Sequence, residues 1–301
     1  MKMKIRVGTR GSNLALIQTN WAIDRLKEKF PEVEFEVKII KTKGDKILHL
    51  SLDKIGDKGL FVKEIESQLL EGEIDLAVHS MKDMPAEVVD GLKFAAVPKR
   101  EDPRDVIILR EGLNSFDELP IGATIGTGSK RRKYQLLRKR PDLNIVPIRG
   151  NIETRISKIE SENLDGIVLA ASGVLRADLE DKITEYLPVD LMIPAPAQGA
   201  LALEIRENDV VLEKMIDAIK DEISQIQTDA ERSYLAGIDG SCHIPMGAYC
   251  EVDGAKLTLI GIFGDEDGEK ITVASLEGNR DNPKELGSNL AKLVLKKHRE
   301  E

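Results

Sequence analysis

Cysteine, aromatic side chains and long apolar runs are all scarce in this sequence of 301 residues. Its two cysteines, Cys242 and Cys250, fit no zinc-ligand spacing and argue against a disulfide framework. Six Phe, four Tyr and one Trp are too few for the stacking platforms of single-strand nucleic-acid binders. No apolar run approaches the roughly 18 residues that a membrane span needs. Because no signal-peptide core stands near the N-terminus, the sequence predicts a cytoplasmic protein.

Positive charge is also in deficit, since 44 Lys and Arg oppose 53 Asp and Glu and the net charge is −9. This balance argues against a general binder of nucleic acid or of anionic membranes. Charged residues make up 32% of the chain and hydrophobic residues 41%, as in an ordinary folded protein. The length predicts two or three domains rather than one.

The first part of the chain alternates short apolar segments with amphipathic ones. Expected strands are residues 5–7, 35–40 and 76–80, and expected helices run from the Ser12 cap to about residue 30 and from 61 to 70, with a loop over 41–59. This order of elements predicts parallel strands with helices on both faces of the sheet.

A second α/β unit follows a charged crossing between Pro98 and Pro103. Its expected strands are 106–109, 123–126, 145–148 and 166–171, and its expected helices are 130–140 and 152–162. A further proline-containing crossing leads to a strand over 200–205. We therefore expect a discontinuous domain 1 (1–99 with 197–220), a domain 2 (100–196), and a ligand cleft between them.

The last part has a different pattern. It contains expected helices over 223–236 and 283–298, and expected strands over 256–264 and 270–276. Such strands, joined by a turn and backed by helices, predict a small α+β domain 3 over 221–301. Cys250 lies in an apolar run and is predicted to be a core residue. Cys242 follows small residues and precedes Pro245 and Gly247, which indicates a tight loop in which the thiol is either reactive or structurally inert.

Basic residues are concentrated in one segment of this acidic chain. Residues 126–155 carry nine basic and two acidic side chains. Arg131 and Arg132 open an expected helix, Arg149 follows the next strand, and Arg155 lies one turn into the helix after it. Since the ends of parallel strands share one sheet edge, these arginines can converge on a carboxylate or phosphate. The alternative is a solvated basic face, which we favour for Lys133, Arg138, Lys139 and Arg140.

Polar residues follow the strands of domain 1 in the same way. Arg10 and Ser12 follow the first strand, and Ser80, Lys82 and Asp83 follow the third. A carboxylate among cations suits a ligand that also develops positive charge, because two unit charges about 4 Å apart interact by roughly 4 kcal/mol at an effective dielectric of 20. Alternatively, Asp83 is only a turn residue that binds its own backbone. His79 is most simply a hydrogen-bonded strand residue.

These segments together resemble the hydroxymethylbilane synthase (porphobilinogen deaminase) family. The matching segments are 8–12 (GTRGS), 43–45 (KGD), 58–64 (KGLFVKE), 79–85 (HSMKDMP), 100–105 (REDPRD), 126–132 (GTGSKRR), 149–151 (RGN) and 198–200 (QGA), with Cys242, Pro245 and Gly247. The resemblance runs in order from residue 8 to about 250. Two positions depart from the family pattern, namely Ser241 in place of Gly and Gly128 in place of Ser.

The resemblance implies a transferase with two domains like type II periplasmic binding proteins and a smaller C-terminal domain. It implies that Cys242 carries a dipyrromethane cofactor as a thioether. Four porphobilinogen molecules are then added head to tail with loss of ammonia, and hydrolysis releases hydroxymethylbilane. Loss of ammonia leaves a cationic azafulvene, which a carboxylate can stabilise.

Residue by residue, the resemblance implies three groups of site residues. Asp83 is the expected catalytic residue and also a cofactor contact. The other expected cofactor contacts are Ser80, Lys82, Thr127, Ser129, Arg131, Arg132 and Arg155. The expected substrate contacts are Arg10, Ser12, Gln18, Arg149 and Arg176. Lys54 and Lys58 fall on a Gly-containing segment that we interpret as a lid.

Two other functions compete with this interpretation. A non-catalytic two-lobed anion-binding protein would explain the α/β pair and the arginines, but it needs neither Asp83 nor a reactive cysteine. An RNA-binding protein that uses residues 126–155 is disfavoured by the acidic remainder and the few aromatics. We expect a monomer that binds porphobilinogen, with no metal ion, nucleic acid or membrane as partner.

Overall fold

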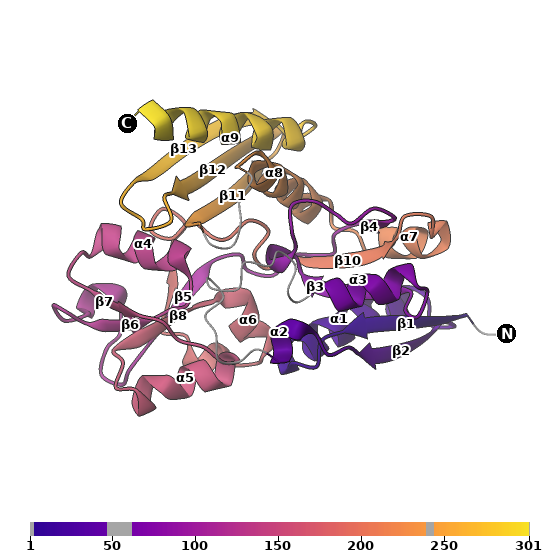
Figure 1. Ribbon diagram of the computed structural model, residues 1–301, viewed down its shortest axis with the longest axis horizontal. Helices are drawn as coiled ribbons and strands as arrows, with labels where there is room; N and C mark the ends of the chain where they lie inside the picture. Colours follow the sequence, from indigo (N-terminus) through magenta and orange to yellow (C-terminus); the bar gives the residue numbers. More distant parts are fainter. Residues whose placement is uncertain (1–2, 47–61, 239–243, 301) are drawn as a thin grey trace. The chain divides into compact units, whose positions relative to one another are not determined.

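The computed structural model describes residues 3–46, 62–238 and 244–300 (Figure 1). The chain divides into two compact units, one made of Met1–Arg100 with Ala200–Ile226 and the other of Glu101–Gly199 with Gln227–Glu301. The chain crosses between the units beside the two proline-containing segments of the sequence. We describe each unit by itself.

The first unit contains a five-stranded sheet in the order β2-β1-β3-β10-β4. Its strands are β1 (Lys4–Thr9), β2 (Glu34–Ile39), β3 (Leu76–Ser80), β4 (Leu92–Phe94) and β10 (Leu201–Arg206). β1 pairs in parallel with β2 and β3, as predicted. β10 runs antiparallel to both β3 and β4, so a strand that follows the second α/β segment of the chain lies between two strands of this sheet.

Helices cover both faces of this sheet. Its helices are α1 (Asn13–Lys29), α2 (Lys43–Lys46), α3 (Lys63–Leu70), α7 (Val210–Asp217) and the first part of α8 (Glu222–Ile238). α1 and α7 pack with Leu76 and Val78 of β3 in one core. α3 packs with Ala77 in another core on the opposite face. Alternate residues of β3 therefore point to different helices, as the pleat of a strand requires.

Asp75, just before β3, ties two strands together. Its carboxylate accepts hydrogen bonds from Nη2 of Arg6 at 2.7 Å and from Nη2 of Arg206 at 3.0 Å. Burial alone would raise the pKa of Asp75, but the bonds from Arg6 and Arg206 lower it to about 2. The ionised carboxylate therefore stabilises the fold above the unfolded-state pKa of about 4, and this contribution is lost as the pH falls towards 2.

We expect Asp75→Asn to lower the free energy of unfolding at neutral pH by about 2 kcal/mol. The gap between the variant and the wild type should shrink as the pH falls through the range from about 4 to about 2, because protonation removes the same charge from the wild type. Urea denaturation across this pH range measures the gap. A gap that does not change with pH would contradict the assignment.

The second unit contains a five-stranded sheet of the same kind, in the order β7-β6-β8-β5-β9. Its strands are β5 (Asp105–Leu109), β6 (Thr124–Gly126), β7 (Asn144–Val146), β8 (Gly166–Ala170) and β9 (Glu185–Leu187). β6 is parallel to β7 and β8, whereas β5 is antiparallel to β8 and β9. The two sheets are thus alike, because in each the fourth strand across the sheet, β10 or β5, is antiparallel to both of its neighbours.

Helices also cover both faces of the second sheet. Its helices are α4 (Lys130–Lys139), α5 (Ile152–Ser161) and α6 (Ala171–Arg176). Leu136 of α4 packs on one face with Ile107, Ile125 and Val168. α5 and α6 pack on the other face, where Val174 joins Ile108, Ile167 and Leu169.

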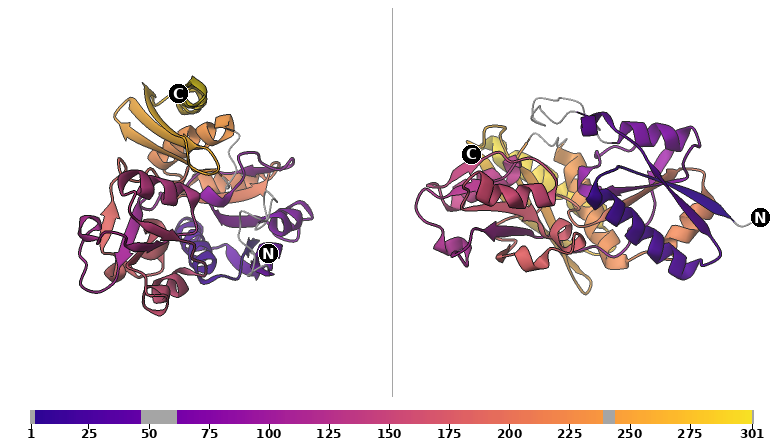
Figure 2. Two further views of the ribbon diagram at one scale, coloured as in Figure 1. Left: turned by 60° about the vertical axis from the view of Figure 1, so that its left-hand side comes forward. Right: turned by 90° about the horizontal axis from the view of Figure 1, so that it is seen from below.

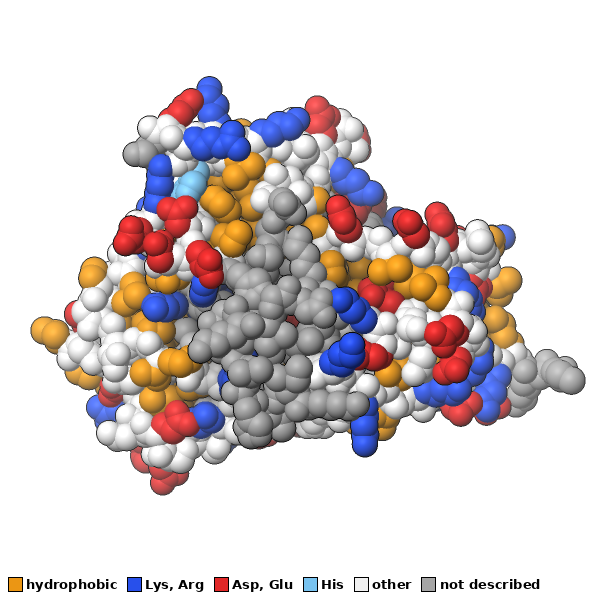
Figure 3. Space-filling view, in the orientation of Figure 1, with side chains coloured by type: hydrophobic (Ala, Val, Ile, Leu, Met, Phe, Trp, Pro, Cys, Tyr) orange, Lys and Arg blue, Asp and Glu red, His pale blue; other side chains and the backbone are white. Residues whose placement is uncertain are grey.

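The C-terminal part of the second unit is a three-stranded antiparallel sheet of β11 (Met246–Asp253), β12 (Lys256–Gly264) and β13 (Ile271–Asn279). α8 and α9 (Pro283–Glu300) pack against it, as Figure 2 shows. Tyr234 of α8 lies over Gly261, where a larger residue would collide with its ring. Figure 3 shows Lys and Arg side chains spread over α9, as expected of a surface helix.

The predicted α/β fold class is confirmed, and most predicted elements lie within two residues of the observed ones. Three expectations were wrong in detail. The expected loop over 41–59 contains the short helix α2 in its described part. The C-terminal sheet has a third strand, β11, which carries the buried Cys250 and was predicted only as an apolar core segment. The three-residue strands β4 and β9 and the helices α6 and α7 were not predicted. No helix of the described ranges is long and apolar enough to cross a membrane.

Candidate functional site

The carboxyl end of β1 carries the first group of predicted site residues. β1 ends at Thr9, so half-buried Arg10 and Ser12 follow at the sheet edge, and β3 ends beside it at Ser80. Ser12 is the cap of α1, and its Oγ accepts from the amide of Ala15 at 3.3 Å. This cap is the one that the sequence predicted, and it fixes the path of the chain from strand to helix.

Gln18 and Ser80 are brought together, although they stand 62 residues apart. Gln18 is buried in α1, and its Nε2 donates to Oγ of Ser80 at 3.0 Å. The amide and the hydroxyl can exchange donor and acceptor roles, since Oγ also lies 3.1 Å from Oε1 of Gln18. The bond fixes the end of β3 to α1 directly before the turn that holds Asp83.

Asp83 is exposed at the end of a short 3₁₀ turn, Met81–Asp83. The amide of Met84 donates to the carbonyl of Met81 at 3.1 Å, and the amide of Met81 donates to the carbonyl of Ala200 at 3.0 Å. Backbone bonds therefore hold the turn at both ends, and the Asp83 carboxylate is not what closes it. Lys82, which stands between Met81 and Asp83, is half-buried.

The start of α4 carries the corresponding group in the second unit. Ser129 caps this helix, and its Oγ accepts from the amide of Arg132 at 3.4 Å. Thr127 is buried, and its Oγ1 accepts from the amide of Ser129 at 3.3 Å. The two hydroxyls thus lie at the carboxyl end of β6 beside the positive end of a helix, a favourable place for an anion.

Arg131 and Arg132 are both buried, and both bind Asp105. Nη1 of Arg131 donates to Oδ2 of Asp105 at 2.7 Å and to the carbonyl of Ile193 at 2.7 Å. Nε and Nη2 of Arg132 donate to Oδ1 of Asp105 at 3.0 and 2.8 Å. The sequence predicted these arginines as anion-binding residues but did not predict that a carboxylate of the chain would lie between them.

The position of Asp105 follows from the sheet topology. β5 is antiparallel to β8, so Asp105 at the start of β5 pairs with Ala170 at the carboxyl end of β8. Gln198 also donates to its carboxylate, at 3.0 Å. Burial alone would raise the pKa of Asp105, but Arg131 and Arg132 hold it well below its usual range. Asp105 is therefore ionised and orients both guanidiniums.

We expect Asp105→Asn to lower the free energy of unfolding by about 3–5 kcal/mol, because it leaves two buried guanidiniums without their counter-charge. Asp102→Asn is the matched control, since Asp102 makes the same kind of bond to Arg104 at 2.6 Å on a partly exposed surface. Its loss should be about 1 kcal/mol or less. Urea denaturation measures both. Equal losses would contradict the assigned role of Asp105.

Three further predicted arginines lie at this edge of the second unit. Arg149 is half-buried after β7. Nε of Arg155 donates to the carbonyl of Gly150 at 2.8 Å, and Gly150 has a φ of +120°, a conformation that suits glycine. Nη2 of Arg176 donates to the carbonyl of Gly199 at 2.7 Å. Burial lowers the pKa of Arg176 to about 10, so its guanidinium still carries a full charge at neutral pH.

Cys242, Lys54 and Lys58 lie outside the described residues, so the predicted cofactor attachment and lid stay predictions. Each group described above is assembled within one unit, at the carboxyl edge of its own sheet. Whether the two groups meet in one cleft, as the sequence predicts, also stays a prediction.

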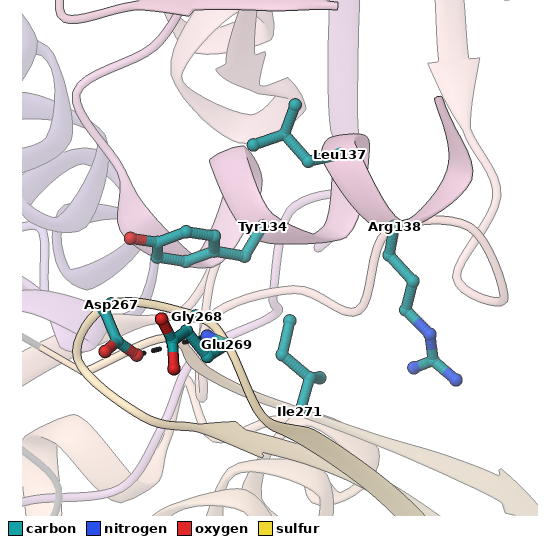
Figure 4. Close-up of a pocket in the computed structure, with 7 residues that line it drawn as sticks. All are labelled: Tyr134, Leu137, Arg138, Asp267, Gly268, Glu269 and Ile271. Atoms are coloured by element: carbon teal, nitrogen blue, oxygen red, sulfur yellow. Dashed lines mark hydrogen bonds between the residues drawn. The ribbon is translucent and has the colours of Figure 1, made fainter. Parts of the chain in front are cut away.

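A depression of about 490 Å³ lies elsewhere in the second unit, between α4 and the turn that joins β12 to β13 (Figure 4). The residues that line it are Tyr134, Leu137, Arg138, Asp267, Gly268, Glu269 and Ile271. They include none of the predicted site residues. Arg138, which the sequence placed on a solvated face, is exposed at its edge.

Cations and hydroxyls lie at the carboxyl edge of the α/β sheet in each unit, an arrangement typical of proteins that bind anionic ligands. Comparison with known proteins identifies the family. The family model described as "Porphobilinogen deaminase, dipyromethane cofactor binding domain" matches residues 5–214, and the one described as "Porphobilinogen deaminase, C-terminal domain" matches residues 226–296. The chain belongs to the porphobilinogen deaminase family.

Curated relatives match along almost the whole chain. A porphobilinogen deaminase of Clostridioides difficile (strain 630) is 66% identical over 98% of both chains. Another, of Clostridium novyi (strain NT), is 58% identical over 98% of this chain and 99% of its own length. Among solved structures, the probable amino-acid ABC transporter extracellular-binding protein ytmK of Bacillus subtilis is 14% identical with a TM-score of 0.44, covering 73% of this chain and 90% of its own.

Proposed function

We propose that this protein is a porphobilinogen deaminase, also called hydroxymethylbilane synthase. It is a transferase that joins four porphobilinogen molecules head to tail with loss of ammonia and releases hydroxymethylbilane. The observation that carries this conclusion is the 66% identity to a porphobilinogen deaminase across 98% of the chain. The second candidate, a non-catalytic anion-binding protein, is not favoured.

The residues at the two sheet edges fit a dipyrromethane. Each pyrrole of such a group bears two carboxylates, and Arg149, Arg155 and Arg176 offer guanidiniums whose forked geometry suits them. Arg131 uses only Nη1 in its bonds to Asp105 and Ile193, so its Nε and Nη2 have no acceptor among the described residues. When bound, a dipyrromethane supplies the free pyrrole carbon that accepts the first substrate unit. The thiol of Cys242 would hold it as a thioether.

The arginines would bind and orient the carboxylates of the substrate and of the growing chain. Of these residues, Arg10 and Lys82 belong to the first unit of the chain, and Arg149 and Arg176 belong to the second. Asp105 keeps Arg131 and Arg132 in place, so that Nε and Nη2 of Arg131 point in a fixed direction. Such preorganised cations bind a polyanion without reorganising at the moment of reaction.

Asp83 would act on the reacting pyrrole. Its exposed carboxylate can accept a hydrogen bond from a pyrrole N–H and can hold or release a proton there. As ammonia leaves, positive charge develops on the substrate ring, and a carboxylate about 4 Å away stabilises it by roughly 4 kcal/mol at an effective dielectric of 20. The backbone bonds of Met81 and Met84 fix the turn that carries this carboxylate.

The experiment that tests this function follows two products in the same reaction. Purified protein that carries its cofactor is incubated with porphobilinogen, and ammonia and the mass of the released pyrrole product are measured. A deaminase releases one ammonia for each porphobilinogen consumed and a linear product of four units. An anion-binding protein would bind porphobilinogen without releasing ammonia, and that result would overturn the proposal. A monomeric state and a cytoplasmic location stay predictions of the sequence.

A further inference from the structure

A buried pair of titratable side chains, His79 and Glu204, lies behind the catalytic turn. Nε2 of His79 lies 3.2 Å from Oε2 of Glu204, and both side chains are almost fully buried, with 6% and 0% exposure. His79 stands on β3 and Glu204 on β10, 125 residues away in the sequence. None of the functions assigned above uses either residue.

The strand register places this pair near the end of β3, where His79 stands four residues before Asp83. Glu204 pairs with Ala77 across the two strands, so its side chain lies on the same face of the sheet as Ala77 and His79. Ser80 points to the opposite face, where it binds Gln18 of α1. The end of β3 is therefore fixed on both faces, by Gln18 on one and by Glu204 on the other, within four residues of Asp83.

The burial of Glu204 is hard to explain by stability alone. Its second oxygen, Oε1, is buried and has no hydrogen-bond partner among the described residues. Glu66 of α3 is also buried here, and its pKa is raised by burial first and by Glu204 second. Two buried carboxyl groups thus lie near one imidazole, to which Glu204 is hydrogen-bonded. Apolar side chains of similar volume commonly give equal or greater stability in such places.

We propose that the Glu204–His79 bond is a positioning device that holds the turn Met81–Asp83 against β10. The proposal rests on the proposed function, in which Asp83 is the catalytic residue. Glu204 of β10 binds β3 through the side chain of His79. A backbone bond from the amide of Met81 to the carbonyl of Ala200 then joins the residue after β3 to the residue before β10. Loss of the side-chain bond should loosen the turn without unfolding the sheet.

The test replaces the pair by apolar side chains in the double variant Glu204→Leu/His79→Phe. We expect kcat for porphobilinogen to fall roughly tenfold to a hundredfold, because small displacements of a catalytic group reduce rate steeply. KM should change by about twofold or less, since the arginines that bind substrate are untouched. Amide hydrogen exchange should become faster at Met81 and Met84, a readout that does not depend on activity.

Asp75→Asn is the matched control. It replaces a half-buried, ion-paired carboxylate at the opposite end of β3, so it destabilises the same strand but lies away from the catalytic turn. Its kcat and the exchange at Met81 should equal those of the wild type. If the double variant is folded and has wild-type kcat and exchange, or if Asp75→Asn produces the same changes, the proposal is wrong.

Two more variants complete the experiment. His79→Gln keeps an N–H that can donate to Glu204 and should restore most of the activity and the slow exchange. If the double variant does not fold, kcat and amide exchange are measured on Glu204→Met instead. Wild-type values of both quantities in that variant would overturn the proposal. Asp83→Asn is measured in parallel. If it is fully active, the role of Asp83 fails, whereas an inactive Asp83→Asn beside a fully active apolar pair rejects only the positioning role.

Discussion

Replacing Asp83 by asparagine is expected to lower kcat by roughly 10²–10⁴-fold while the protein stays folded and its cofactor stays attached. The amide keeps the shape of the carboxylate but can neither balance a developing positive charge nor accept a proton at neutral pH. Stability should hardly change, because Asp83 is exposed and the turn is closed by the backbone of Met81 and Met84.

The matched control for this variant is Glu87→Gln. Glu87 is an exposed carboxylate four residues further along the chain, so the same chemical change is made on the same surface outside the turn. Its kcat should stay within about twofold of the wild type, as for most exposed positions. Rates of ammonia release are measured for both variants, with the cofactor content of each determined by mass. Normal turnover of Asp83→Asn would remove Asp83 from the catalytic role.

Replacing Cys242 by serine should abolish turnover altogether. The proposed mechanism needs a thioether at this position, and a serine hydroxyl is a far weaker nucleophile than a thiolate at neutral pH. Without an attached primer, no chain can be built, however well the arginines bind porphobilinogen. We expect ammonia release to fall to the background of the assay.

Cys250→Ala is the control for a general effect of losing a thiol. Cys250 is fully buried in β11 and cannot reach a ligand in solution. Its replacement should reduce stability, as for any core truncation, while the folded fraction keeps a normal rate. Substantial turnover by Cys242→Ser, or loss of turnover by Cys250→Ala under conditions in which it is folded, would contradict the proposed attachment.

Elements with clear end signals were predicted well from the sequence. Ser12 caps α1 as expected, because a hydroxyl next to an amphipathic segment is a strong local signal, and α4 begins at Lys130 as predicted. The direction of β5 and β10 could not be predicted in this way, since periodicity shows that a segment is extended but not how it pairs. β11 was missed as a strand because a short run of apolar residues does not by its periodicity distinguish a strand from another buried segment.

The positions of the cations at strand ends were also predictable, but their internal partners were not. Asp105 meets Arg131 across 26 residues, and Glu204 meets His79 across 125. Such contacts depend on antiparallel strands that arrive from elsewhere in the chain. A weak signal was nevertheless present, because Asp105 and Glu204 each interrupt or begin an apolar strand, and a carboxylate in such a place needs a partner.

The distribution of charge explains why the net value misleads. The chain carries a charge of −9, yet Arg131 and Arg132 are buried and held in place by Asp105 rather than spread over the surface. The single negative charge of Asp105 binds and orients two positively charged guanidiniums. In the proposed function, the remaining N–H groups of Arg131 would bind an anionic ligand in a protein whose overall charge would repel it.

The mass of the intact protein under denaturing conditions tests the central claim most directly. The protein is produced in cells that make porphobilinogen, and the wild type is compared with Cys242→Ser. The wild type should exceed its sequence mass by two linked porphobilinogen-derived units, and Cys242→Ser should have its plain sequence mass. An unmodified wild type, or the same added mass on Cys242→Ser, would contradict the proposal that this chain carries its dipyrromethane on Cys242.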